Sequence, residues 1–358
     1  LNILNYYIQI LEDSKQLLSD HLNDKKFTVE DVNNIETEDE KLIRAKNIYI
    51  DFDIYGYTRE YLNEGVEQYN DFINYHFNID YNGRKTNDDI YDLYDTNYGD
   101  PNISNIKDSE SHSTHVSGII SGNRQNESGN KGINNLVEIM ALRAIPNGDE
   151  YDKDVARAIR YAVDNGAKII NGSFGKYFSS NPEWVIDAIR YASENNVLVI
   201  AAAGNESKDL DSLSNDNYPN DQFFNKNEFS DTFIKVGASS INLDGNFTAY
   251  FSNYGKINVD VFAPGVDIYS SMPGNKYKSQ SGTSMASPVV AGIASLIMSY
   301  FPKLSAKKVK EIILESGIEV DLKIGNLGNN KHFREYSKSG KLVNAYNALI
   351  LASKIKRK

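Results

Sequence analysis

The most constraining feature of this sequence is the uninterrupted apolar run Val197–Ala203. A strand with one face in water alternates apolar and polar residues, whereas a fully apolar run next to a helical pattern indicates a strand buried on both faces. Such strands occur in parallel sheets that carry helices on both sides. The run therefore predicts an α/β fold with a mainly parallel central sheet.

The segments around this run alternate in the same way from about residue 112 onward. Apolar residues recur at helical spacing in Asp154–Asn165 and Pro182–Asn195, and Met285–Tyr300 is apolar on nearly every side, as in a buried helix that Pro302 ends. Two more helices are expected at Ala306–Ser316 and Leu342–Lys354. The strand candidates are Val137–Ala144, Ala167–Asn171, Phe233–Ala238, Val259–Ala263 and Lys276–Gln280. This order implies right-handed strand–helix–strand crossovers.

Residues 1–109 differ from the rest of the chain in composition. They are rich in Asn, Asp, Glu and Tyr, and segments such as Val66–Phe77 carry apolar residues at helical spacing. The stretch around residues 80–108 is polar and rich in Asn and Asp. We therefore expect a mostly helical region that ends in a polar loop over residues 1–109, and one continuous α/β domain over residues 110–358.

Charge and cysteine content exclude several classes of function. The net charge is −11 and the one marked basic run is Lys354–Lys358, which argues against nucleic acid as a partner. The chain has no cysteine, so disulfides, thiolate catalysis and Cys-ligated zinc are excluded. It also lacks a run of about 18 apolar residues, so no transmembrane segment is expected. The sequence does not specify the oligomeric state.

The strongest chemical signal is the motif Gly-Thr-Ser-Met-Ala-Ser-Pro at residues 282–288. It places Ser284 at the start of a buried helix, where the helix dipole and free backbone N–H groups favour an oxyanion next to the hydroxyl. Gly282 allows close approach of a substrate. The alternative is an ordinary capped core helix, because serine is common at helix starts.

A second signal is the pair of histidines in the segment Ser111–Gly118. His112 and His115 are three residues apart and share a helix face, so a metal pair is conceivable. Neither a carboxylate nor a third histidine follows at ligand spacing, and we predict no metal site. The preferred interpretation is that His112 opens a helix as a catalytic base and that His115 packs inside.

A third signal is the end of the apolar run at Gly204 and Asn205. It places a side-chain amide at the carboxyl edge of the sheet, where ligands bind in open α/β folds. Taken alone, Asn205 is more typical of a turn.

Together these segments resemble the subtilisin-like family of serine peptidases. His-Ser-Thr-His-Val-Ser-Gly is similar to the family's histidine motif, Gly-Thr-Ser-Met-Ala-Ser-Pro matches its serine motif and Ala-Ala-Gly-Asn matches its oxyanion motif. Residues 170–175 resemble its substrate-binding strand, and Phe262–Gly265 resembles the segment before its serine. The motifs follow the family's order from about residue 110 to residue 350. The resemblance implies a three-layer fold and a peptidase domain over residues 110–358.

The resemblance also implies roles for individual residues. Ser284 is the expected nucleophile, His112 the general base and acid, and Asn205 the oxyanion donor of a serine endopeptidase. The residues expected to bind the substrate backbone or to wall the pocket for its side chain are Ser173, Phe174, Gly175, Ala202, Ala203 and Gly204. The reaction needs no cofactor, and no calcium site of the kind that many relatives carry is readable. The expected partner is a peptide or protein substrate, and the expected location is extracytoplasmic, although this chain shows no signal peptide.

The third member of the triad is the point where the match departs from the family. The family's acid ends an apolar strand, is followed by Ser or Thr and then Gly, and precedes the histidine. Asp51 is the nearest candidate, but Phe52 and Asp53 follow it and the stretch Lys41–Phe77 has a helical pattern. Ser113 also stands where the family has Gly.

Two further segments, Phe77–Arg84 and Arg143–Val155, resemble a subgroup of bacterial subtilases, many from Bacteroidetes-like organisms. These proteins carry a long helical insertion between the acid and the histidine. This resemblance implies that residues 1–85 are the insertion and that the acid lies upstream of Leu1 in a chain truncated at its N-terminus. Asp51 as the acid, or a chain without any acid, stay open as alternatives.

Two other functions are compatible with parts of this pattern. A pseudopeptidase that binds peptides or regulates a partner would need no acid, but it would not need Ser284, His112 and Asn205 together. An α/β-hydrolase esterase would need Gly-x-Ser-x-Gly after a strand, whereas Ala286 fills the last position here.

Overall fold

The computed structural model describes residues 1–54, 57–84, 86–104, 110–125, 127, 129–145, 148, 150–222, 227–325 and 331–355. The end of the predicted polar loop, residues 105–109, and the end of the terminal basic run, residues 356–358, lie outside these ranges. The chain forms two compact units. One contains Leu1–Lys85 with Pro146–Asp149, and the other contains Thr86–Ile145 with Glu150–Lys358.

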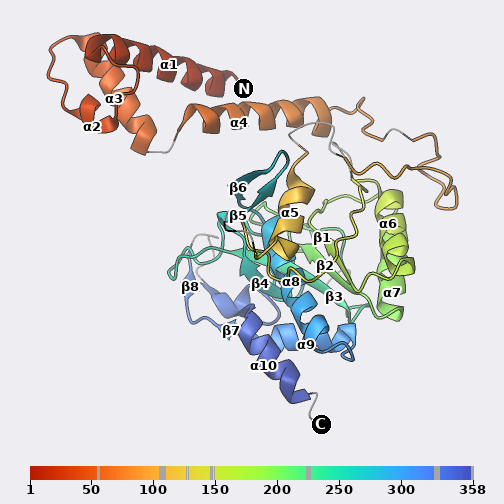
Figure 1. Ribbon diagram of the computed structural model, residues 1–358. Coiled ribbons are helices and arrows are strands. Elements are labelled where there is room, and N and C mark those ends of the chain that lie inside the picture. Colours follow the sequence, from red (N-terminus) through yellow and green to blue (C-terminus); the bar gives the residue numbers. More distant parts are fainter. Residues whose placement is uncertain are drawn as a thin grey trace. The chain divides into compact units, whose positions relative to one another are not determined.

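The first unit is built from helices, shown in red and orange in Figure 1. They are α1 (Asn2–Leu22), α2 (Val29–Asn33), α3 (Glu40–Ile54), α4 (Arg59–Asp71) and a π-helical turn at Phe72–His76. Its small core contains Leu18, Val32 and Leu42, which are contributed by α1, α2 and α3. Thr28 caps α2, because its side chain accepts from the Asp31 N–H and the Asp31 carboxylate accepts from the Thr28 N–H.

The second unit contains a six-stranded sheet with the strand order β1-β2-β3-β4-β10-β7. The strands are β1 (Ile169–Gly172), β2 (Leu198–Ala202), β3 (Phe233–Ser239), β4 (Val261–Pro264), β10 (Lys341–Leu342) and β7 (Ile318–Glu319). The first five run parallel, and β7 pairs antiparallel with β10. The mainly parallel sheet expected from the sequence is confirmed.

Helices cover both faces of this sheet (Figure 1). Val199 and Ala201 of β2 face the cluster formed with α6 (Asp152–Asp164) and α7 (Pro182–Glu194). Leu198 and Ile200 face the opposite cluster, formed with α8 (Thr283–Tyr300), α9 (Ala306–Ser316) and α10 (Ala345–Ile355). Strand β2 is therefore buried on both sides, as its apolar run predicts.

Helix α8 runs through the centre of the second unit. Its length and its mean hydropathy of 1.3 would also suit a membrane-crossing helix, but 67% of it is buried inside the fold. It begins beside helix α5 (His112–Ser121), because Val116 and Ile119 of α5 pack on Met285. A hairpin of β5 (Ile268–Met272) and β6 (Lys276–Gln280) packs on α5, and a smaller hairpin joins β8 (Lys323–Ile324) to β9 (Lys331–His332).

One predicted strand, Val137–Ala144, is not formed. Its apolar side chains Ile139, Met140 and Leu142 are exposed to 42%, 41% and 38%. Strand β1 is the edge of the sheet, and its first three residues are only half-buried, whereas every residue of β2 and β3 is buried. A strand forms only when a neighbouring strand pairs with it through hydrogen bonds. Within the described ranges, neither the outer edge of β1 nor Val137–Ala144 has such a neighbouring strand.

Candidate active site

Three strands of the parallel sheet end at the N-terminus of α8. Ser173 follows β1, Gly204 and Asn205 follow β2, and Gly265 follows β4. The Gly265 carbonyl accepts a hydrogen bond of 2.8 Å from the N–H of Gly282, the residue that precedes α8. The carboxyl edge of the sheet and the positive end of a long buried helix therefore meet at one place, as the sequence predicts for a ligand site.

Ser284 is the second residue of α8, and its side chain is half-buried. Pro288 has no N–H, so the Ser284 carbonyl lacks the donor that a helix normally provides four residues later. The Ser173 hydroxyl supplies it at 2.8 Å. In return, the Ser284 hydroxyl donates to the Ser173 carbonyl at 3.1 Å. This exchange holds Ser284 at the end of β1.

Asn205 is fixed by Thr283, the first residue of α8. The backbone N–H and the hydroxyl of Thr283 donate to Asn205 Oδ1 at 2.9 and 3.0 Å. Because a backbone N–H can only donate, the oxygen of the amide must face α8 and Nδ2 must face away. In the described part of the chain, Asn205 Nδ2 makes no hydrogen bond. It is therefore available to an oxygen that develops negative charge beside Ser284.

Gly204 is required for this arrangement. Its φ of +102° lies in the region that favours glycine, and a Cβ there would come within 2.4 Å of Asn253 Nδ2. Its N–H donates to the Thr283 hydroxyl at 3.0 Å. The turn that aims Asn205 thus depends on a missing side chain.

His112 is the first residue of α5, and solvent reaches its side chain. It lies one helical turn before Val116, which packs beside Met285. His115 is fully buried, and its Nε2 lies 3.0 Å from the Lys278 carbonyl. The two histidines therefore differ as expected: one is exposed at the helix start, and the other is packed inside. No hydrogen bond joins His112 to Ser284 in the described residues.

The pKa of His112 lies below its ordinary value. The surrounding protein desolvates the imidazolium, and His115 adds repulsion when its own ring is protonated. A carboxylate hydrogen-bonded to His112 would raise the pKa instead, but the described residues place none there. Asp51 lies in α3 of the helical unit, with an exposed side chain.

The remaining predicted residues differ in what they offer a ligand. Ala202 and Ala203 are 3% and 0% exposed, so only their backbone can contact a substrate. The Phe174 side chain packs against the cluster of α6 and α7. Gly175 is exposed, and Gly204 is half-buried. Among the described residues, no group of three or more His, Cys, Asp or Glu side chains could hold a metal ion.

A polar cluster that the sequence does not predict lies behind Gly204. The Tyr177 hydroxyl donates to the Glu206 carboxylate, and Asn253 Nδ2 donates to the same Glu206 oxygen at 3.1 Å. These residues come from three segments that are far apart in the sequence. Glu206 could have been noticed as the residue directly after Asn205, but nothing in its spacing points to Tyr177 or Asn253.

The sequence model of the Subtilase family matches residues 51–338. The thermophilic serine proteinase of Bacillus sp. (strain AK1) is 36% identical over 261 residues, which are 72% of this chain and 55% of that protein. Subtilisin DY of Bacillus licheniformis is 36% identical over 57% of this chain and 69% of its own length. A solved protease structure from Pseudoalteromonas arctica is similar with a TM-score of 0.55 at 25% identity, over 67% of this chain and 70% of that one. The chain thus spans little more than half of the thermophilic proteinase.

We predict that His112 titrates with a midpoint below 6.5, the ordinary value for histidine. Desolvation and the charge of His115 both disfavour the imidazolium, so the ring is neutral at pH 7 and able to accept a proton. The C2 proton shift, followed by NMR from pH 4 to 9, measures this midpoint, and His112→Gln identifies the signal. A midpoint at or above 6.5 would contradict the electrostatics described for this ring.

Proposed function

This chain belongs to the subtilase family of serine proteases, and we propose that it is the catalytic portion of a serine endopeptidase whose nucleophile is Ser284. The observation that carries the proposal is the N-terminus of α8. There Ser284, its own N–H and the Asn205 amide lie together at the ends of β1 and β2. The substrate would be a peptide or protein, and the reaction needs no cofactor. A location outside the cytoplasm is proposed from the family resemblance alone.

In the proposed reaction, Ser284 Oγ attacks the carbonyl carbon of the scissile peptide bond while His112 accepts the hydroxyl proton. The tetrahedral oxyanion accepts hydrogen bonds from Asn205 Nδ2 and from the Ser284 N–H, one of the N–H groups that a helix leaves unpaired at its start. His112 then donates the proton to the leaving amine, and an acyl-enzyme remains on Ser284. Water, activated by His112, hydrolyses this ester.

The attack requires a small rearrangement of Ser284. Its hydroxyl donates to the Ser173 carbonyl in this structure, and it would have to rotate about χ1 to donate to His112. Rotation would release the Ser173 carbonyl. A substrate backbone that adds as a strand along Ser173–Gly175 would then use that carbonyl as an acceptor.

We infer that the acid of the triad lies on a strand upstream of Leu1. Three observations support this inference. Strand β1 is an edge whose first three residues are only half-buried, Val137–Ala144 exposes apolar side chains without forming a strand, and no described carboxylate contacts His112. An added parallel strand between β1 and Val137–Ala144 would give both a partner, and its carboxyl end would lie at the same sheet edge as Ser173.

A peptide-binding pseudopeptidase is the second candidate. It is favoured by the same absence of a described carboxylate at His112 and by the bond that holds the Ser284 hydroxyl on Ser173. Such a protein would bind extended peptides along Ser173–Gly175 without cleaving them. The two candidates differ in whether Ser284 reacts with an electrophile.

In a protein that includes the residues encoded before Leu1, a fluorophosphonate probe is expected to label Ser284, because the helix start and the Asn205 amide stabilise the charge on the phosphonyl oxygen. Intact-mass spectrometry and peptide mapping measure the label, and Ser284→Ala should abolish it. Ser287→Ala is the matched control, since Ser287 is fully buried in the same helix and should not react. If this extended protein is folded and takes no label, the pseudopeptidase is supported instead.

The upstream acid is tested by extending the chain at its N-terminus with the residues encoded before Leu1. We expect the longer protein to cleave casein and to lose about 10⁴-fold in turnover when the aspartate that ends its added strand is changed to asparagine, because the neutral amide no longer holds the imidazole in its reactive tautomer. Asp51→Asn in the same protein should leave turnover unchanged. The opposite result, a large loss in Asp51→Asn only, would contradict the upstream acid.

A further inference from the structure

The proposed substrate segment has a buried amide directly behind it. The short stretch Asn217–Tyr218 pairs with the residues after β1, since the Lys176 N–H donates to the Tyr218 carbonyl at 2.9 Å and the Tyr218 N–H donates to the Lys176 carbonyl at 2.8 Å. A Cβ built at Gly175 would lie 3.5 Å from Asn217 Nδ2. The carboxamide of Asn217, which is 4% exposed, thus borders the segment that the proposed reaction uses to hold the substrate.

A buried lysine determines which way this amide faces. Lys235 of β3 is 1% exposed, and its Nζ lies 2.6 Å from Asn217 Oδ1 and 3.3 Å from the Asn217 carbonyl. Burial lowers the pKa of Lys235 to about 7, but the amine carries N–H groups in both protonation states and donates in either. Because Oδ1 is taken by Lys235, Nδ2 faces the other way, and the described residues offer it no acceptor.

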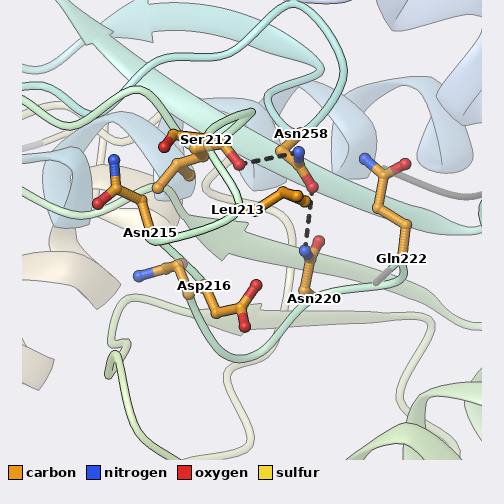
Figure 2. A pocket seen from close by; sticks show the side chains of 9 residues that line it. Ser212, Leu213, Asn215, Asp216, Asn220, Gln222 and Asn258 are labelled. Atoms are coloured by element: carbon orange, nitrogen blue, oxygen red, sulfur yellow. Dashed lines mark hydrogen bonds between the residues drawn. The ribbon is translucent and has the colours of Figure 1, made fainter. Parts of the chain in front are cut away.

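The other amides around this loop donate to neighbouring side chains or to the backbone instead. Figure 2 shows Asn215, Asn220, Gln222 and Asn258 around one pocket. Asn220 Nδ2 donates to Asn258 Oδ1 at 3.2 Å, and Gln222 Nε2 donates to the Ile257 carbonyl at 2.7 Å. Their N–H groups therefore stabilise the loop itself. Asn217 lines the same pocket but differs from them in its Nδ2, which has no acceptor among the described residues and lies 3.5 Å from a Cβ built at Gly175.

The segment that follows β2, which is expected to wall the substrate pocket, carries an acceptor. A Cβ built at Gly204 would lie 2.9 Å from Glu206 Oε2. Oε2 accepts from Tyr177 and Asn253, whereas Oε1 has no hydrogen bond among the described residues. The Lys208 ammonium lies 3.6 Å from the centre of the Tyr177 ring, so a positive charge stands close to the carboxylate of Glu206.

We propose that Asn217 and Glu206 make this pocket selective for a neutral carboxamide side chain, glutamine or asparagine, at the substrate residue that precedes the scissile bond, with Lys235 as a positioning residue. The inference rests on the proposed function and deepens it. A carboxamide has an acceptor for Asn217 Nδ2 and donors for Glu206 Oε1. It satisfies both groups at once.

Other side chains fit this pair of groups less well. An apolar side chain would leave the Asn217 donor without an acceptor. In a site built for hydrogen bonding, an unpaired donor of this kind strongly lowers the affinity for the ligand that lacks the acceptor. A carboxylate is repelled by Glu206. A lysine or arginine can bond to Glu206, but it has no acceptor for Asn217 and approaches the Lys208 ammonium.

The test measures peptide binding to the Ser284→Ala form of this chain, so that it depends on neither catalysis nor the acid. The probes are four fluorescent peptides that differ only in having Gln, Met, Glu or Lys at the variable position, and affinity is measured by anisotropy. We expect the Gln peptide to bind at least about 10-fold more tightly than the Met peptide. Equal affinities for Gln and Met, or no binding by any peptide, would overturn the inference.

Two matched variants assign the preference to its residues. Asn217→Asp keeps the shape and the bond to Lys235 but replaces the donor with an acceptor, so the Lys peptide should become the tighter ligand. Asn220→Ala, in the same loop, should keep the preference for Gln. A Gln preference that survives Asn217→Asp would contradict the assignment. Glu206→Gln, at an exposed position, should raise the affinity for the Glu peptide by removing the repulsion.

Lys235→Met tests the positioning role, because the amide can then turn either way. The affinity for the Gln peptide should fall relative to that for the Met peptide, while the affinity for the Met peptide stays the same. A general loosening of the fold would instead lower the affinity for both peptides. Unchanged ratios in a folded variant would remove Lys235 from the account. The outcome of fluorophosphonate labelling is independent of these binding tests. If the protein is labelled but shows no preference for the Gln peptide, only the present inference is contradicted. If it prefers the Gln peptide but is not labelled, only the proposed enzyme activity is contradicted.

Discussion

The N-terminus of α8 is the structural element on which the rest of the site depends. Pro288 deprives the Ser284 carbonyl of its helical donor, and Ser173 supplies that donor from the end of β1. On the other side, Thr283 binds both Gly204 and Asn205 at the end of β2. One helix end is thereby bound to two neighbouring strands. The proposed nucleophile, the proposed oxyanion donor and the proposed substrate segment are held together by these few hydrogen bonds.

The chemistry is concentrated in the loops at one edge of a rigid sheet. Strands β2 and β3 are completely buried, and helices cover both of their faces, so the loop starts have little freedom to move. The exception is β1, which is an open edge whose first three residues are half-buried. It is also the strand nearest to Ser173. In our account, one proposed strand upstream of Leu1 would both cover the open edge of β1 and supply the acid of the proposed triad.

The parts of this structure that the sequence predicted are those that depend on local pattern. Val197–Ala203 is buried on both faces because every side chain in it is apolar, and Ser284 lies at a helix start because the motif places it there. Val137–Ala144 is apolar enough for a strand, but pairing depends on a neighbour that the pattern does not contain. The bond between Lys235 and Asn217 joins residues that are distant in the chain, and neither residue is unusual in its own segment.

The central claim is that Ser284 attacks a carbonyl whose oxygen Asn205 receives. A crystal structure of the chain with a peptide boronate tests it most directly, because boron becomes tetrahedral when a serine binds it. Our account predicts continuous density from Ser284 Oγ to boron, loss of the bond to the Ser173 carbonyl, and a boron oxygen about 2.7–3.1 Å from Asn205 Nδ2. A boronate bound elsewhere, with the Ser284 hydroxyl still on Ser173, would contradict it.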